Sequence, residues 1–159
     1  DSVTLIGHSM GGWAAMMAGA RDERIKRIIH IAGFNLGLVG PFIEQGGNEE
    51  KMVRERFKEL SVPFNVGNID LIMKEIKINS DMFNPLLFAR KLREKRILMV
   101  YSKNDPLSIP DLHFKTLHQV FKEIGIKDLT DHQIDSDHSF SDKRIELQDT
   151  IWKWLRERL

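Results

Sequence analysis

A lone serine lies among glycines in the stretch 7–12, which reads GHSMGG and directly follows an apolar run at Val3–Ile6. A short apolar run with β-branched residues predicts a strand that is buried on both faces. The segment 10–20 is rich in alanine and methionine and predicts a helix whose small side chains let it lie close to a sheet. The serine, Ser9, therefore lies where a strand turns into a helix, and this order favours an α/β fold.

The same alternation continues along the chain. Apolar runs at 25–34 and 96–102 predict two further buried strands, and the more polar run at 127–134 predicts a fourth strand near a sheet edge. Because a strand, a crossover helix and a second strand form a right-handed unit with parallel strands, these runs predict a mostly parallel sheet. We expect an α/β fold with about four strands flanked by helices.

The region 35–95 has a different character, since it opens with a glycine-rich stretch and carries charged segments with apolar residues at helical spacing. Asn84 is suited to cap a helix and Pro85 to be its first residue, so a helix is expected to lead back to the sheet. We predict a helical cap inserted at 35–95 between core segments at 1–34 and 96–159.

Composition narrows the classes of function. The 24 lysine and arginine residues balance 23 aspartate and glutamate residues, so the net charge of +1 does not favour nucleic acid as a partner. The chain has no cysteine, which excludes a disulfide framework and a thiol nucleophile and slightly favours a cytoplasmic location. No run approaches the roughly 18 apolar residues of a membrane-spanning helix. The chain starts at Asp1 rather than at methionine, so secretion stays open.

Polar side chains follow the first, third and fourth predicted strands, at Ser9, Asp105 and His138. The carboxyl ends of parallel strands meet at one edge of a sheet, so these side chains are expected to gather there. A hydroxyl, an imidazole and a carboxylate are the groups that an activated serine requires: a nucleophile, a base, and an acid that holds the base in one tautomer.

The residues around Ser9 suit this chemistry. A rapid turn from strand to helix forces the serine into a strained backbone conformation, and side chains at Gly7 and Gly11 are expected to crowd that turn. The backbone N–H of Met10, at the start of the helix, is expected to point toward a developing oxyanion.

The sequence GHSMG matches the G-x-S-x-G turn called the nucleophile elbow, and the chain order Ser9, Asp105, His138 resembles the α/β-hydrolase superfamily. The resemblance covers essentially the whole chain, which looks like the second half of such a fold. It implies that Ser9 is the nucleophile, His138 the general acid and base, and Asp105 the orienting acid. It also implies that Met10 supplies an oxyanion donor through its backbone.

Two features depart from that family. Many members have a His-Gly pair shortly before the acid, whereas residues 101–105 here read YSKND. In the family, further strands and the loop with the second oxyanion donor precede the elbow, and here they would lie before Asp1. We therefore expect the N-terminal half of the fold to lie upstream.

The resemblance implies a serine hydrolase that transfers the acyl group of a small molecule, most simply a carboxylic ester, without cofactor or metal. A serine peptidase of the prolyl oligopeptidase type has the same triad order and is an alternative. A second alternative is a catalytically incomplete, hydrolase-like interaction module that lacks half of its oxyanion hole.

Each proposed residue also has a simpler structural interpretation. Ser9 could lie in a turn that binds an anion or nothing, Asp105 could cap the following helix, and His138 could be solvated. Other residues compete for these roles: Asp135 and Asp137 as rival acids, His132 with Asp135, Asp137 and His138 as a metal site, and His30 as a hydrogen-bonded core histidine.

Overall fold

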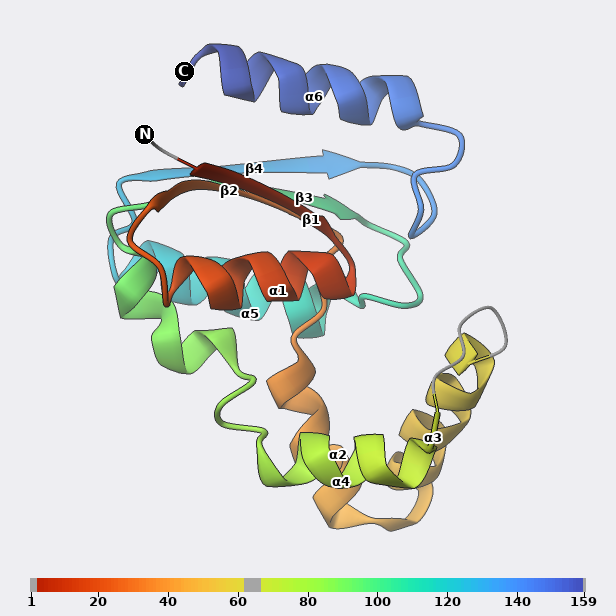
Figure 1. Cartoon of the computed structure of the whole chain (residues 1–159). Helices are drawn as coiled ribbons and strands as arrows, with labels where there is room; N and C mark the ends of the chain where they lie inside the picture. Colours follow the sequence, from red (N-terminus) through yellow and green to blue (C-terminus); the bar gives the residue numbers. More distant parts are fainter. Residues whose placement is uncertain (1–2, 62–66, 159) are drawn as a thin grey trace. The chain divides into compact units, whose positions relative to one another are not determined.

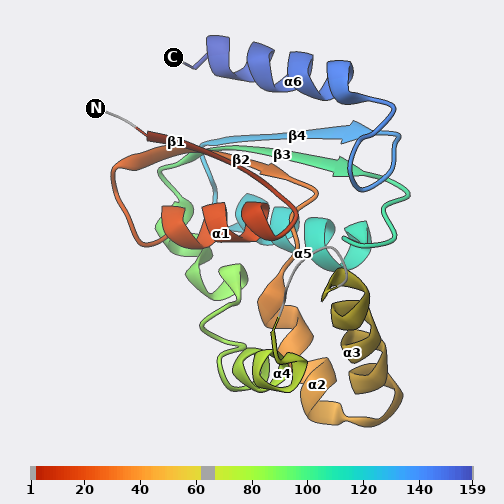
Figure 2. The same cartoon turned by 45° about the vertical axis from the view of Figure 1, so that its right-hand side comes forward.

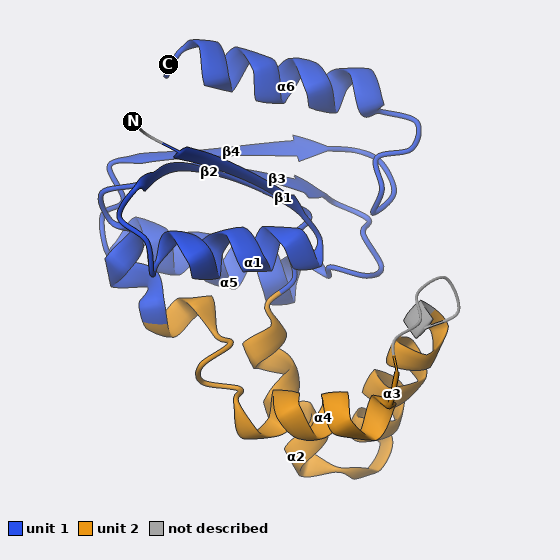
Figure 3. Cartoon of the chain, in the orientation of Figure 1, with its two compact units in different colours: residues 1–34, 88–159 blue, residues 35–87 orange. Residues whose placement is uncertain are grey.

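A computed structural model describes residues 3–61 and 67–158 of the chain. The chain divides into two compact units, one formed by residues 1–34 and 88–159 and the other by residues 35–87 (Figure 3). The predicted insertion runs to residue 95, whereas the second unit ends at Leu87. Its role as a cap stays a prediction.

A parallel sheet forms the centre of the first unit (Figure 1). Within the described residues it has four strands in the order β1-β2-β3-β4, and each neighbouring pair is parallel. The strands are β1 (Val3–His8), β2 (Ile25–Ile31), β3 (Arg96–Ser102) and β4 (Asp128–Ile134). The predicted α/β class, the parallel sheet and the place of the polar strand at an edge are confirmed.

Helices cover both faces of this sheet. α1 (Met10–Gly19) and α5 (Pro110–Glu123) lie on one face, and α6 (Arg144–Arg156) lies on the other (Figures 1 and 2). Side chains alternate between the faces along each strand. On the α6 face the buried cluster consists of Ile29, Ile31, Ala32, Leu98, Val100, Ile134, Phe140 and Trp154.

The small residues of α1 bring this helix close to the sheet, as predicted. A Cβ atom added at Gly19 would lie 2.4 Å from Cδ1 of Ile28 on β2, and buried Ala15 and Met16 belong to the same helix. Larger side chains would push the helix away from the strands.

β1 differs from the sequence-based expectation of a strand buried on both faces. Val3 is 43% exposed and Ile6 is 54% exposed. The physical reason is the position of β1, because it is the edge of the sheet in the described residues and contributes no residue to the buried cluster on the α6 face. An apolar run therefore indicated the strand correctly but not its burial.

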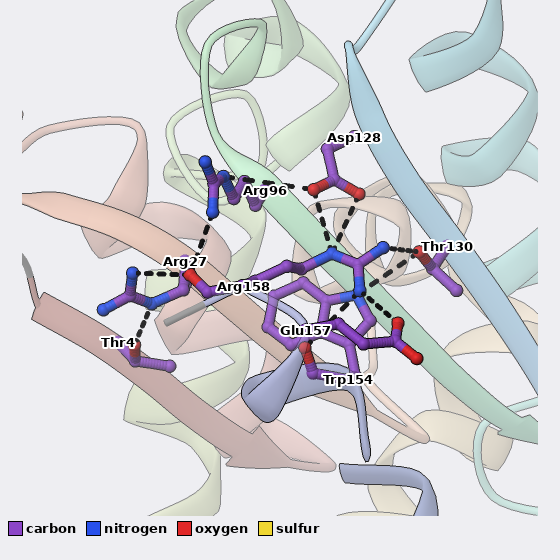
Figure 4. A network of polar contacts seen from close by, with 8 residues as sticks. All are labelled: Thr4, Arg27, Arg96, Asp128, Thr130, Trp154, Glu157 and Arg158. Carbon is purple, nitrogen blue, oxygen red and sulfur yellow. Dashed lines mark hydrogen bonds and ion pairs between the residues drawn. The ribbon is translucent and has the colours of Figure 1, made fainter. Parts of the chain in front are cut away.

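A polar clamp fixes the end of α6 against the sheet (Figure 4). The Arg158 guanidinium donates to both carboxylate oxygens of Asp128 at 2.9 and 3.1 Å, and it lies over the Trp154 ring at 4.9 Å. The backbone carbonyl of Arg158 accepts hydrogen bonds from Arg27 at 3.2 Å and from Arg96 at 2.9 Å. Three strands are thus joined to one helix end.

We expect Arg158→Met to lower the free energy of unfolding by about 1 to 3 kcal/mol, since hydrogen bonds to a partly buried charge are lost. Urea unfolding followed by circular dichroism measures the change. Glu94→Gln is the matched control, because Glu94 forms an exposed pair with Lys127 and solvent-screened pairs of this kind contribute little to stability. Equal losses in both variants would contradict the clamp.

The second unit is helical: η1 (Leu36–Leu38), α2 (Val39–Gln45), α3 (Gly47–Ser61) and α4 (Ile69–Ile78). Met73 and Ile76, two of the apolar residues at helical spacing in this region, are buried on α4. The helix predicted after Asn84 is the 3₁₀ helix η2 (Pro85–Leu92), and the Asn84 side chain accepts from the N–H of Leu86 at 3.1 Å. Across residues 3–61 and 67–158, no helix is long and apolar enough to cross a membrane.

Candidate active site

Ser9 lies between the end of β1 and the start of α1, in a strained turn. Its φ of 56° and ψ of −122° fall in a region that residues other than glycine rarely adopt. Backbone hydrogen bonds hold it there: the Ser9 N–H donates to the carbonyl of Ile31 at 2.8 Å, and the Ser9 carbonyl accepts from Gly12 at 2.9 Å and from Phe34 at 3.4 Å. The half-buried serine is therefore fixed by α1 and by the end of β2.

Gly7 leaves no space for a side chain. A Cβ atom there would lie 2.0 Å from the carbonyl oxygen of Gly11, so the predicted crowding is present at this position. The same expectation is wrong for Gly11, where an added Cβ would meet no atom within 4 Å among the described residues. The second tight position in this turn is Gly12. A Cβ atom added there would lie 3.0 Å from Cα of Gly33, because the start of α1 packs on the loop after β2.

Asp105 and His138 form a direct pair. Nδ1 of His138 lies 2.7 Å from Oδ2 of Asp105, and the two side chains are 13% and 1% exposed. Asp105 follows β3 and His138 follows β4, which are neighbouring strands of the sheet. Because Nδ1 is used by the carboxylate, Nε2 is the nitrogen left to act on another group.

Asp105 is held in its ionised form. Burial of the carboxyl group opposes ionisation, but hydrogen bonds from His138 and from the backbone N–H groups of Ser108 and Leu107 outweigh it, so the pKa of Asp105 lies below its ordinary value. Those N–H groups donate to Oδ1 at 2.9 and 2.8 Å. A buried, ionised and oriented carboxylate is suited to stabilise an imidazolium.

The rival acids have other partners. Asp135 accepts from the Asn104 side chain at 3.1 Å, and Asp137 accepts from the backbone N–H of Ser141 at 2.9 Å. Within residues 3–61 and 67–158, no group of three or more His, Asp or Glu side chains is arranged to hold a metal ion.

Ser9 and His138 are not hydrogen-bonded to each other in the part of the chain that is described. His8, the neighbour of Ser9 along the chain, has its ring centroid 4.8 Å from that of His138. Catalytic hydrogen bonds are often long before substrate binds. Met10 is the first residue of α1, where backbone N–H groups have no partner within the helix.

Two serines that the sequence did not single out link the loops around this site. Ser108, after Asp105, donates through Oγ to the carbonyl of Gly33 at 2.7 Å, and it is 5% exposed. Ser102, at the end of β3 and fully buried, donates through Oγ to the carbonyl of Ser136. Their sequence context carries no signal, since isolated serines at strand ends and in loops are common.

Two histidines are buried beneath the site. His30 packs against Gly12 and Gly33 and is a core histidine, as expected, but its Nδ1 has no hydrogen-bond partner among the described residues, so the expected hydrogen bond is absent at this nitrogen. The pKa of His30 is lowered to about 4, chiefly by burial and to a smaller extent by nearby His113, while a backbone hydrogen bond acts in the opposite direction. Burial also lowers the pKa of His113 to about 4, although Asp105 acts in the opposite direction.

Because the pKa values of His30 and His113 are lowered by burial, we expect the free energy of unfolding to fall as the solution is acidified. Between pH 6.5 and about 4 the unfolded chain binds protons that the folded chain does not, so the free energy of unfolding decreases as pH falls through this window. Each histidine contributes about 3 kcal/mol to the full change. Urea unfolding at pH 7, 6 and 5 measures the slope.

The control for this prediction is His30→Gln, which removes one of the two titrating groups and is expected to reduce the slope by about half. The carboxyl group of Asp105, with its lowered pKa, titrates below this window. A free energy of unfolding that does not change between pH 7 and 5 would contradict the burial of neutral histidines.

Comparisons with known proteins agree with this architecture. The acylaminoacyl peptidase of Pyrococcus horikoshii aligns with 99% of the chain at a TM-score of 0.67 and 17% identity. A metagenomic α/β-hydrolase enzyme from lagoon sediments of Mar Chica, Morocco, aligns with 99% of the chain at a TM-score of 0.60 and 18% identity. An esterase of Pyrococcus furiosus aligns with 98% at a TM-score of 0.61 and 13% identity.

These likenesses define the fold: the chain has the fold of the α/β hydrolases. It spans 24% of the peptidase chain, 62% of the metagenomic enzyme and 54% of the esterase. No protein-family model matches the sequence, and no curated protein matches it.

Proposed function

We propose that this chain carries the acyl-transfer site of a serine hydrolase that acts on carboxylic esters. The observation that carries the proposal is the strained Ser9 turn beside the buried pair of Asp105 and His138, with all three residues following strands of one parallel sheet. A strained serine, an ionised acid and a base, in this order along the chain, match the requirements of nucleophilic catalysis.

The first step is the attack of Ser9 on the ester carbonyl. Nε2 of His138 accepts the proton of Oγ as the bond from oxygen to the carbonyl carbon forms. Asp105 holds the proton on Nδ1 and stabilises the imidazolium that results. The Met10 N–H donates to the developing oxyanion.

The second step releases both products. His138 returns the proton to the leaving alcohol as the ester bond breaks, which leaves an acyl group on Ser9. Water then attacks the acyl-enzyme, again with His138 as the base, and the acid product departs. Ser9 regains its proton, so the cycle consumes one water for each ester.

Hydrolysis of p-nitrophenyl acetate and butyrate tests this function on the full chain. We expect turnover that Ser9→Ala abolishes, because the acyl group then has no acceptor. Ser141→Ala is the matched control, since Ser141 contacts Asp137 rather than Ser9, Asp105 or His138; its side-chain bond to Asp137 is lost, but its backbone N–H still donates to that carboxylate. Equal turnover by the wild-type chain and Ser9→Ala would overturn the proposal.

A second candidate function is peptide hydrolysis, which the structural likeness to the acylaminoacyl peptidase favours. The same residues can perform it, because an amide also reacts through an acyl-enzyme. Acylaminoacyl p-nitroanilides distinguish the two functions: Ser9-dependent release of nitroaniline indicates a peptidase, whereas cleavage of the esters alone indicates an esterase. If the chain is instead a catalytically incomplete interaction module, we expect it to turn over neither the esters nor the anilides.

A further inference from the structure

We propose that His8 is a positioning residue that holds the loop carrying His138, through a hydrogen bond from its imidazole to the His138 backbone carbonyl. The inference rests on the proposed function of Ser9 and His138. It gives the residue before the nucleophile a task in building the site.

The contact is direct. Nε2 of His8 lies 2.7 Å from the carbonyl oxygen of His138, a good hydrogen-bond distance. A carbonyl only accepts, so Nε2 carries the proton and donates it. The ring of His8 lies 4.8 Å from that of His138, and its centroid lies 6.3 Å from the ring of Phe140 in an edge-on arrangement.

The loop that carries His138 is held on both sides of this contact. Before it, the carbonyl of Ser136 accepts from buried Ser102. After it, Phe140 is fully buried with a φ of 52°, and its N–H donates to the carbonyl of Asp137 at 3.2 Å. His138 lies between these two anchors, and the bond from His8 is what joins its backbone to the strand of the nucleophile.

His8 also closes a ring of contacts around the site. The backbone of Ser9 is bonded to the loop after β2, and that loop is bonded through the carbonyl of Gly33 to Ser108. The Ser108 N–H is bonded to Asp105, Asp105 to His138, and His138 to His8, the neighbour of Ser9. In the part of the chain that the structure describes, His8 supplies the hydrogen bond between the β1 and β4 ends, so this bond helps to set the distance from Ser9 to His138.

Two variants separate hydrogen bonding from packing. His8→Phe keeps a ring against His138 and Phe140 but cannot donate. His8→Gln loses the ring, and its side-chain amide nitrogen occupies about the place of Nε2 and can donate to the same carbonyl. We expect His8→Phe to slow fluorophosphonate labelling of Ser9 about tenfold or more, and His8→Gln to restore most of the rate.

A spectroscopic readout keeps this test independent of catalysis. The proton between His138 and Asp105 is expected to give a downfield imidazole signal in proton NMR, which Asp105→Asn removes and thereby assigns. We expect the signal in the wild-type chain and in His8→Gln, and its broadening by solvent exchange in His8→Phe.

The outcomes are distinct. An unchanged signal and an unchanged labelling rate in His8→Phe would overturn the role of His8 while leaving the hydrolase proposal intact. A wild-type chain without labelling removes the hydrolase proposal, and the NMR comparison alone then decides whether His8 holds the loop.

Discussion

Gly7→Ala is expected to destabilise the protein by more than about 3 kcal/mol and to abolish reaction at Ser9, because the new methyl group has no space. Its Cβ atom would lie 2.0 Å from the carbonyl oxygen of Gly11 and 2.6 Å from the backbone nitrogen of Gly12. These are backbone atoms, so no side-chain rotation relieves the clash and the turn itself must move. Urea unfolding gives the loss of stability, which is a large part of the 5 to 15 kcal/mol typical of a whole domain.

Gly11→Ala is the matched control, two positions beyond the serine. An added Cβ there meets no atom within 4 Å among the described residues, and alanine favours a helix over glycine by about 1 kcal/mol. We expect Gly11→Ala to be neutral or slightly stabilising. Similar losses in both variants would mean that the turn is not shaped as described.

Asp105→Asn is expected to lower kcat by about 10⁴-fold while the protein stays folded. The asparagine oxygen can still accept the N–H groups of Leu107 and Ser108, which now bind Oδ1 of the aspartate. Its amide nitrogen, however, faces Nδ1 of His138 and donates to it. The imidazole proton then lies on Nε2, so His138 can no longer accept the proton of Ser9.

Steady-state hydrolysis of p-nitrophenyl esters measures this effect, and circular dichroism checks the fold. Asp137→Asn is the matched control, because Asp137 lies beside His138 in sequence but accepts a loop N–H from Ser141. We expect it to retain close to the wild-type rate. A larger loss of activity in Asp137→Asn than in Asp105→Asn would show that Asp137, and not Asp105, is the orienting acid.

Much of this fold follows from local patterns in the sequence. The apolar runs before Ser9 and Asp105 indicated strands, although the run before Ser9 is not buried on both faces as expected, and the polar run before His138 indicated an edge strand. The gathering of polar side chains after the strands follows from the parallel topology, since the carboxyl ends of all the strands lie at one edge of the sheet. The contact between Asp105 and His138 is the consequence of that topology for neighbouring strands.

What the sequence did not predict depends on contacts between distant segments. The exposure of Ile6 reflects its edge position, and the free space at Gly11 reflects its exposed place in the first turn of α1. Ser108 and Ser102 act through carbonyls of Gly33 and Ser136, and backbone acceptors leave no mark on residue type. His8 was within the motif itself, yet its partner lies 130 residues away along the chain.

The central claim is that Ser9 is an activated nucleophile. Incubation of the full chain with a fluorophosphonate, followed by mass spectrometry of the peptide that contains Ser9, tests it most directly. We predict one covalent adduct on Ser9 in the wild-type chain and none in Ser9→Ala. A wild-type chain without an adduct, or an equal adduct on Ser9→Ala, would contradict the claim.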